Sequence, residues 1–112
     1  MTASSFTKTK TRRQADKVLD EWRKASRRVH EIVRFDDTSL HTGGLYCSHS
    51  MDALEDATGR CGYTSPKWSA AKVRRLAKST NWTDVKGPLW AVLSAREFLL
   101  TAAKLGASIS FD

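Results

Sequence analysis

The sequence predicts an all-α protein, a small single-domain bundle of about four helices with irregular central loops and a short extended C-terminal tail. The 112 residues fit one domain. Hydrophobic residues make up 40% and charged residues 28%, a balance typical of globular proteins and not of disordered chains. Helical apolar spacing, with proline or glycine at the ends of the apolar runs, marks the helices. We expect a flexible basic arm over residues 1–11 and a single helical domain over residues 12–112.

The N-terminal third combines this arm with the first helix. Residues 1–11 are rich in Ser, Thr and Lys and lack both acids and a regular apolar pattern, so little offsets the entropy lost on ordering. From about Arg13 to Phe35 the apolar side chains recur on one helical face. The other face mixes acids and bases, with Asp20 and Lys24 at the stabilising i,i+4 spacing, which predicts a solvated surface. The apolar face contains Ala15, Val18, Leu19, Trp22, Ala25, Val29, Ile32 and Val33.

The centre of the chain is predicted to be irregular around one short helix. Residues 36–50 lose the helical period and contain Gly43-Gly44, which favours a turn. Ser50 is a suitable cap for a helix over Met51–Thr58, with Gly59 just beyond its end. A second irregular stretch follows and reaches Ser65.

A basic helix is predicted over Pro66–Ser79, because Ser65 suits the cap position and Pro66 the first helical position. Its core face consists of Ala70, Val73, Leu76 and Ala77. The remaining arc carries five cations and no carboxylate, namely Lys67, Lys72, Arg74, Arg75 and Lys78. Trp68 falls inside this basic arc, which leaves two interpretations: its ring stacks on a base, or it packs over a loop as part of the core.

The short central helix followed by the basic helix invites comparison with a helix-turn-helix, whose second helix enters the major groove of DNA. The connection over residues 59–65 has seven residues, whereas the motif usually has three or four. In the looser form of a recognition helix, Arg74 and Arg75 suit paired bonds to guanine or phosphate, and the lysines suit phosphates.

The last helix is expected to start at Pro88 and to end before Gly106. It is apolar around most of its circumference, which predicts a central position or a shared subunit interface, and a homodimer is one of the expected states. Arg96 lies away from the polar stripe and is predicted to pair with a carboxylate of residues 36–56 if buried. Residues 107–112 alternate and predict an extended edge or a clamp on the core. The polar stripe consists of Ser94, Glu97, Thr101 and Lys104.

Metal and catalytic sites receive little support from the sequence. Four potential zinc ligands are His41, Cys47, His49 and Cys61, but their spacing fits no established zinc pattern, and two unlinked thiols are expected instead. Acids and histidines of residues 36–56 leave open a metal-dependent nuclease. Since no phosphate-binding loop, dinucleotide motif or activated nucleophile is present, we expect a protein that is not an enzyme and has no cofactor.

The formal net charge of +7 favours a polyanionic partner. The sequence therefore predicts a small basic regulatory protein that binds nucleic acid, DNA in preference to RNA. The alternative is a protein-binding module or inhibitor of the mobile-element or phage type, for example anti-defence, docked on the acidic surface of a nucleic-acid-handling complex. No apolar run of about 18 residues and no apolar N-terminal leader are seen, so a cytoplasmic location without a membrane contact is expected. The predicted nucleic-acid-binding residues are Lys67, Trp68, Lys72, Arg74, Arg75 and Lys78.

Overall fold

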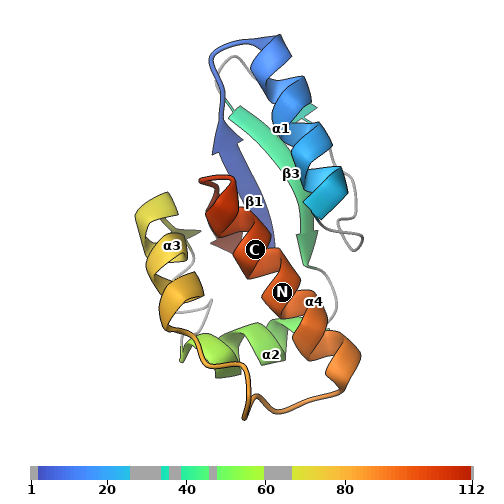
Figure 1. The fold of residues 1–112 in the computed structure, drawn as a ribbon, viewed down its shortest axis with the longest axis vertical. Coiled ribbons are helices and arrows are strands. Elements are labelled where there is room, and N and C mark those ends of the chain that lie inside the picture. The colour runs from blue at the N-terminus through green and yellow to red at the C-terminus, as the bar shows by residue number, and fades with distance from the viewer. Residues whose placement is uncertain (1–2, 26–33, 36–38, 46–47, 60–66, 112) are drawn as a thin grey trace.

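The protein has a mixed α/β fold, and the all-α prediction is wrong. The computed structural model describes residues 3–25, 34–35, 39–45, 48–59 and 67–111. The helices of this part of the chain are α1 (Arg12–Ala25), α2 (Ser48–Thr58), α3 (Ala70–Ser79) and α4 (Leu89–Lys104). The strands are β1 (Ala3–Lys8), β2 (Arg34–Phe35), β3 (Ser39–Leu45), β4 (Lys67–Trp68) and β5 (Ser108–Phe111). They form one antiparallel sheet in the order β2-β3-β1-β5-β4, in which Figure 1 shows β1 beside β3.

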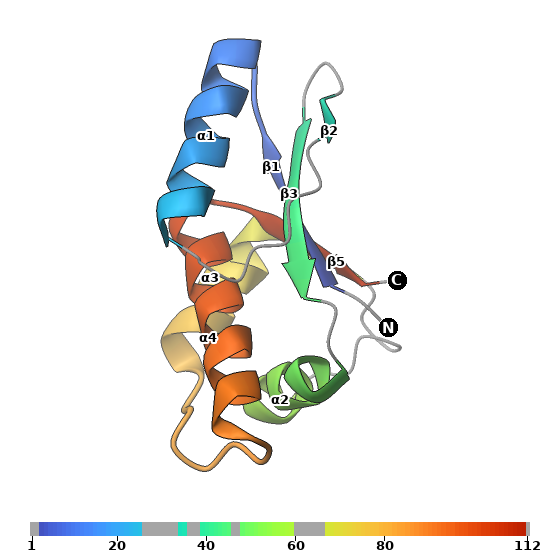
Figure 2. The same ribbon diagram turned by 90° about the vertical axis from the view of Figure 1, so that its right-hand side faces the viewer.

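Helices α1, α3 and α4 lie on one face of the sheet, and α2 lies beyond the end of β3 (Figure 2). Both α2 and α3 pack against α4, which therefore occupies the centre of the helical layer. The core lies between this layer and the sheet. In β5, Ile109 and Phe111 are buried whereas Ser108 and Ser110 are half-buried, the alternation expected of a strand with one covered face.

The N-terminal segment forms the middle of the sheet, so the prediction of a flexible arm over residues 1–11 is wrong. Strand β1 pairs with β3 on one side and with β5 on the other. Ala3 and Ser5 are fully buried. The strand is short and polar, and its backbone is satisfied by partners that come from distant parts of the sequence. The extended C-terminal tail is confirmed, but β5 lies between β1 and β4 and is not an edge strand.

The first helix is confirmed at its start and wrong at its end. It begins at Arg12, and Ala15, Leu19 and Trp22 of the predicted apolar face are buried. Arg34 and Phe35, which were expected to be helical, form β2. Residues 26–33 of the predicted helix lie outside the described residues.

The central helix is longer than expected. It begins at Ser48, so Ser50 lies inside the helix, where it is buried, and is not the cap. Its end is confirmed, because Gly59 follows the last helical residue with a φ of 64°, a conformation that glycine adopts at little cost.

Helix α4 begins and ends where the sequence predicts, but its exposed residues are not those of the predicted polar stripe. Pro88 is the N-cap, and Gly106 follows the helix with a φ of 69°. Thr101, assigned to the polar stripe, is buried, whereas Leu89 is 73% exposed. Arg96 is exposed and does not need a buried carboxylate partner. Four large apolar side chains of α4 are exposed, namely Leu89, Trp90, Leu93 and Leu100.

Alanine at Gly106 or Gly59 is expected to destabilise the protein by about 1–2 kcal/mol, the cost of placing an L-residue in the left-handed region. No heavy atom lies within 4 Å of a Cβ built at either position, so the cost arises from the backbone alone. Urea unfolding followed by circular dichroism measures the change. Asparagine, which tolerates this conformation better, is the control and should lose less. Equal stability of the alanine variants and the parent protein would contradict the observed turn geometry.

Candidate nucleic-acid interface

Helix α3 begins four residues later than the sequence indicated. Ser69 is its N-cap, and the Ser69 Oγ accepts a hydrogen bond from the backbone N–H of Lys72 at 3.2 Å. Lys67 and Trp68 instead form β4, where Lys67 is the partner of Ser110 and Trp68 the partner of Ile109. Ser65 and Pro66, the predicted start, lie outside the described residues.

Trp68 belongs to the core and is removed from the predicted binding residues. Its side chain is fully buried, and its ring meets that of Phe111 edge-on at a centroid distance of 4.7 Å. A nucleic-acid base has no access to a ring that is covered in this way. The interpretation of Trp68 as a core residue is therefore correct. The residue lies in β4, however, and not in the first turn of a helix.

Three cations of α3 share one solvent-exposed face. Arg74, Arg75 and Lys78 are all exposed, while Val73 and Leu76 are buried on the opposite side. At about 100° per residue these three side chains span an arc of about 100°. We call this surface, defined by Arg74, Arg75 and Lys78, the α3 basic face.

The other two predicted cations lie away from this face. Lys72 is half-buried at the flank of α3. Lys67 is exposed, but it projects from β4 and not from the helix. Of the six predicted nucleic-acid-binding residues, the structure therefore brings three together on the α3 basic face.

None of the described residues neutralises the charge of the α3 basic face. Helix α3 contains no acidic residue, and within the described residues no carboxylate forms an ion pair with Arg74, Arg75 or Lys78. Like charges that are held together in this way repel one another unless counterions or an anionic partner screen them.

Helix α1 shows the contrasting arrangement. Lys24 Nζ lies 2.9 Å from Asp20 Oδ2, which confirms the i,i+4 pair that the sequence predicted. The hydrogen bond and the negative charge of Asp20 raise the pKa of Lys24. The cations of α1 are therefore interleaved with acids, as expected of a solvated surface.

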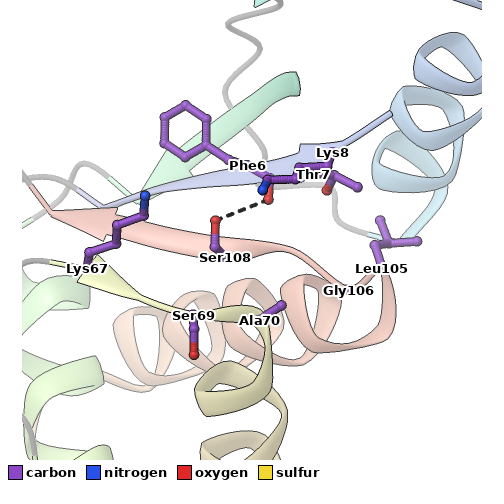
Figure 3. A pocket seen from close by; sticks show the side chains of 9 residues that line it. All are labelled: Phe6, Thr7, Lys8, Lys67, Ser69, Ala70, Leu105, Gly106 and Ser108. Atoms are coloured by element: carbon purple, nitrogen blue, oxygen red, sulfur yellow. Dashed lines mark hydrogen bonds between the residues drawn. The ribbon is translucent and has the colours of Figure 1, made fainter. Parts of the chain in front are cut away.

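A pocket of about 450 Å³ lies beside the start of α3 (Figure 3). It joins the ends of β1 and β5, the β4–α3 junction and the turn after α4. Two lysines, Lys8 and Lys67, contribute to its wall, and none of the described residues that line it is acidic. The lining residues are Phe6, Thr7, Lys8, Lys67, Ser69, Ala70, Leu105, Gly106 and Ser108. No local sequence pattern predicts this pocket, because it depends on strand pairings between residues that are far apart in the chain.

A helix-turn-helix in the strict sense is wrong for this protein. The chain between α2 and α3 covers residues 59–69 and includes β4. A connection of this length does not fix the two helices in the geometry of the motif, whose turn has three or four residues. Any recognition role of α3 therefore rests on its own surface and not on a partner helix of that motif.

Metal ligation is not seen in the part of the chain that the structure describes, where no group of three or more potential ligands gathers. Of the four candidate ligands, Cys47 and Cys61 lie outside the described residues, and His41 is in β3. The fourth, His49, is exposed, and its ring lies edge-on to Trp90 at a centroid distance of 5.8 Å. Among the described helices, none has the length and apolar character needed to cross a bilayer.

Comparison of the chain with protein-family models, with curated proteins and with solved structures gave no match.

Proposed function

We propose that this protein binds nucleic acid through the α3 basic face, with DNA preferred to RNA, and that it acts as a cytoplasmic regulator. The observation that carries the proposal is the exposure of Arg74, Arg75 and Lys78 on a helix without acids. Each cation that neutralises a phosphate releases a counterion, which provides the sequence-independent part of the affinity.

The shape of α3 suits the major groove of DNA. Its ten residues extend about 15 Å, and the major groove of B-DNA, about 12 Å wide, admits an α-helix. The neighbouring exposed residue Ala71 is small and lets a phosphate backbone approach closely. The guanidinium groups of Arg74 and Arg75 are suited to guanine edges or phosphates, and Lys78 supplies a point charge for a phosphate. The deep, narrow major groove of duplex RNA does not admit side chains, which is the reason for the preference.

The second candidate function is a protein-binding module that docks on a nucleic-acid-handling complex. It is favoured by the exposed apolar side chains of α4, of which Leu89 is 73% and Trp90 50% exposed. Contiguous exposed apolar surface is typical of sites that contact other proteins. This function predicts tight protein association through α4 and no saturable binding of nucleic acid at moderate salt.

Fluorescence anisotropy with labelled duplex DNA, single-stranded DNA and duplex RNA across a salt series tests the proposal. Duplex DNA is expected to bind most tightly. The logarithm of its association constant should fall linearly with the logarithm of the salt concentration, with a slope of about −3 for three phosphate contacts. Absence of binding at the lowest salt, or binding that does not change with salt, would refute the proposal.

Replacing Lys78 by alanine should weaken duplex binding and reduce the magnitude of the salt slope by about 1, since one phosphate contact is lost. Lys17→Ala is the matched control, because Lys17 is also an exposed helical lysine but lies on α1. The control should leave the slope unchanged. If both substitutions change the slope equally, the effect belongs to the net charge and not to the α3 basic face.

A further inference from the structure

The pocket beside α3 arises because β5 is shorter than its neighbour β1. Strand β1 pairs with β3 as far as Lys8, but its pairing with β5 stops at Phe6, whose partner is Ser108. On the other side of β5, β4 ends at Trp68 and the chain turns into α3. Thr7 and Lys8 therefore extend past β5, and the turn at Gly106 closes the resulting notch.

The walls of the pocket combine two cations with hydroxyl groups and apolar surface. Lys8 and Phe6 lie two residues apart on β1 and so share one face of the sheet. Figure 3 shows the Lys67 side chain on the same side as the Phe6 ring. The Ser108 hydroxyl, at the floor, donates to the Phe6 carbonyl oxygen at 3.4 Å. Lys8 and Lys67 are both exposed, so their ammonium groups are available to a ligand.

The Thr7 hydroxyl lies on the opposite, covered face of β1 from Phe6 and Lys8, and it has no partner within the described residues. Thr7 is only 6% exposed, and among the described residues nothing forms a hydrogen bond with its Oγ1. Buried polar groups of this kind are usually satisfied by protein, water or ligand. The Oγ1 atom is closed to solvent, so this hydroxyl belongs to the packed side of β1 and offers no contact to a ligand in the pocket.

The pocket is continuous with the α3 basic face. Ala70, the first residue of α3, belongs to the pocket wall. Arg74 and Lys78 follow Ala70 at intervals of four residues, on the same side of the helix and about 6 Å apart along its axis. Positive charge therefore lies in the pocket wall, at Lys8 and Lys67, and on the helix that begins at the pocket, at Arg74 and Lys78.

We propose that this pocket binds the phosphate group of a nucleotide, for which Lys8 and Lys67 in its wall supply the positive charge. Its volume of about 450 Å³ lies within the range of pockets that hold small ligands, about 300–1,000 Å³. Lysine is a common phosphate ligand that acts as a point charge. The phosphate belongs either to a strand that also contacts the α3 basic face, in which case the site extends the proposed function, or to a free mononucleotide.

Nuclear magnetic resonance of the whole chain, titrated separately with adenosine monophosphate, adenosine and inorganic phosphate, tests the pocket directly. A short single-stranded DNA oligonucleotide is titrated in parallel. We expect saturable shifts of the backbone signals of Lys67, Gly106 and Ser108 with the monophosphate or the oligonucleotide, and none with adenosine. Saturation by the monophosphate identifies a free-nucleotide site, and saturation by the oligonucleotide alone identifies a strand phosphate.

Lys8→Ala and Lys67→Ala are each expected to weaken the saturable binding about tenfold, as for the loss of one charge-assisted contact. Lys86→Ala is the matched control, since Lys86 is exposed and outside the pocket, and it should bind as the parent protein does. Lys67→Arg keeps the charge and should retain most of the affinity.

The proposal is overturned if neither adenosine monophosphate nor the oligonucleotide shifts these signals, or if adenosine binds as tightly as its monophosphate. It is also overturned if the Lys8→Ala and Lys67→Ala variants bind as tightly as the Lys86→Ala control. Its failure is separable from that of the proposed function. If the Arg74, Arg75 and Lys78 substitutions abolish duplex DNA binding but no ligand shifts the pocket signals, only the pocket proposal is refuted. Phosphate binding in the pocket with no effect of the α3 substitutions refutes only the role of α3.

Discussion

Replacing Arg74, Arg75 and Lys78 together by alanine is expected to weaken duplex DNA binding about 100-fold at moderate salt and to leave the fold intact. Each lost contact contributes about 1 kcal/mol, and every 1.4 kcal/mol is about tenfold in affinity. All three side chains are exposed, so their removal opens no cavity in the core. Alanine also has the highest helix propensity, which protects α3. Anisotropy titrations measure the affinity, and circular dichroism checks the fold.

The control for this variant removes the same charge from elsewhere. Lys17, Lys86 and Arg96 are exposed residues outside the α3 basic face, and their joint replacement by alanine also lowers the net charge by three. This variant should lose much less affinity than the α3 variant, because a long-range charge effect is screened beyond about 10 Å at 0.1 M salt. Equal losses in the two variants would mean that net charge, and not a defined face, holds the DNA.

Replacing Trp68 by alanine is expected to destabilise the protein by about 3–5 kcal/mol, as for other large aromatic residues removed from a core. The side chain is fully buried against Phe111, and the β4–β5 pairing at Ile109 positions it there. Small domains have about 5–15 kcal/mol of stability in total, so this single change removes a large fraction of it. Urea unfolding followed by circular dichroism measures the loss.

Two further variants keep this prediction decisive if Trp68→Ala does not fold. Trp68→Phe retains most of the apolar volume and should cost clearly less than the alanine variant. Lys67→Ala changes the exposed neighbour on the same strand and should stay within about 0.5 kcal/mol of the parent protein. A stable Trp68→Ala protein that no longer binds nucleic acid would instead assign the ring to the interface and contradict its burial.

The sequence predicted the exposure of Arg74, Arg75 and Lys78 on α3 but placed Lys67 and Trp68 on the wrong element, for a local reason. Ser65-Pro66 and Ser69-Ala70 are both acceptable helix starts, and only the second is used, with Ser69 as the cap. The earlier start would have placed Lys67 and Trp68 on the helix. Because these two residues pair with β5, they form a strand instead. Trp68 is therefore buried, and Lys67 lines the pocket.

Local chemistry was sufficient where the signal lies within a few residues. The ends of α2 and α4 at Gly59 and Gly106 follow from the left-handed conformation that glycine tolerates. The buried side of α1 and the exposed cations of α3 follow from the helical period of 3.6 residues. Each of these features was predicted without knowledge of any distant partner.

The sequence by itself determined the approximate positions of α1, α2, α3 and α4, the acid-free charge of α3 and the extended tail. Only the tertiary structure decided that residues 3–8 form a central strand, since their partners in β3 and β5 lie about 40 and 100 positions away. A helix satisfies its backbone groups within its own segment, whereas a strand does so only through neighbours that folding brings to it. The order of the strands and the two-lysine pocket depend on such neighbours, and so does the choice between the two interpretations of Trp68, which no local pattern in the sequence can make.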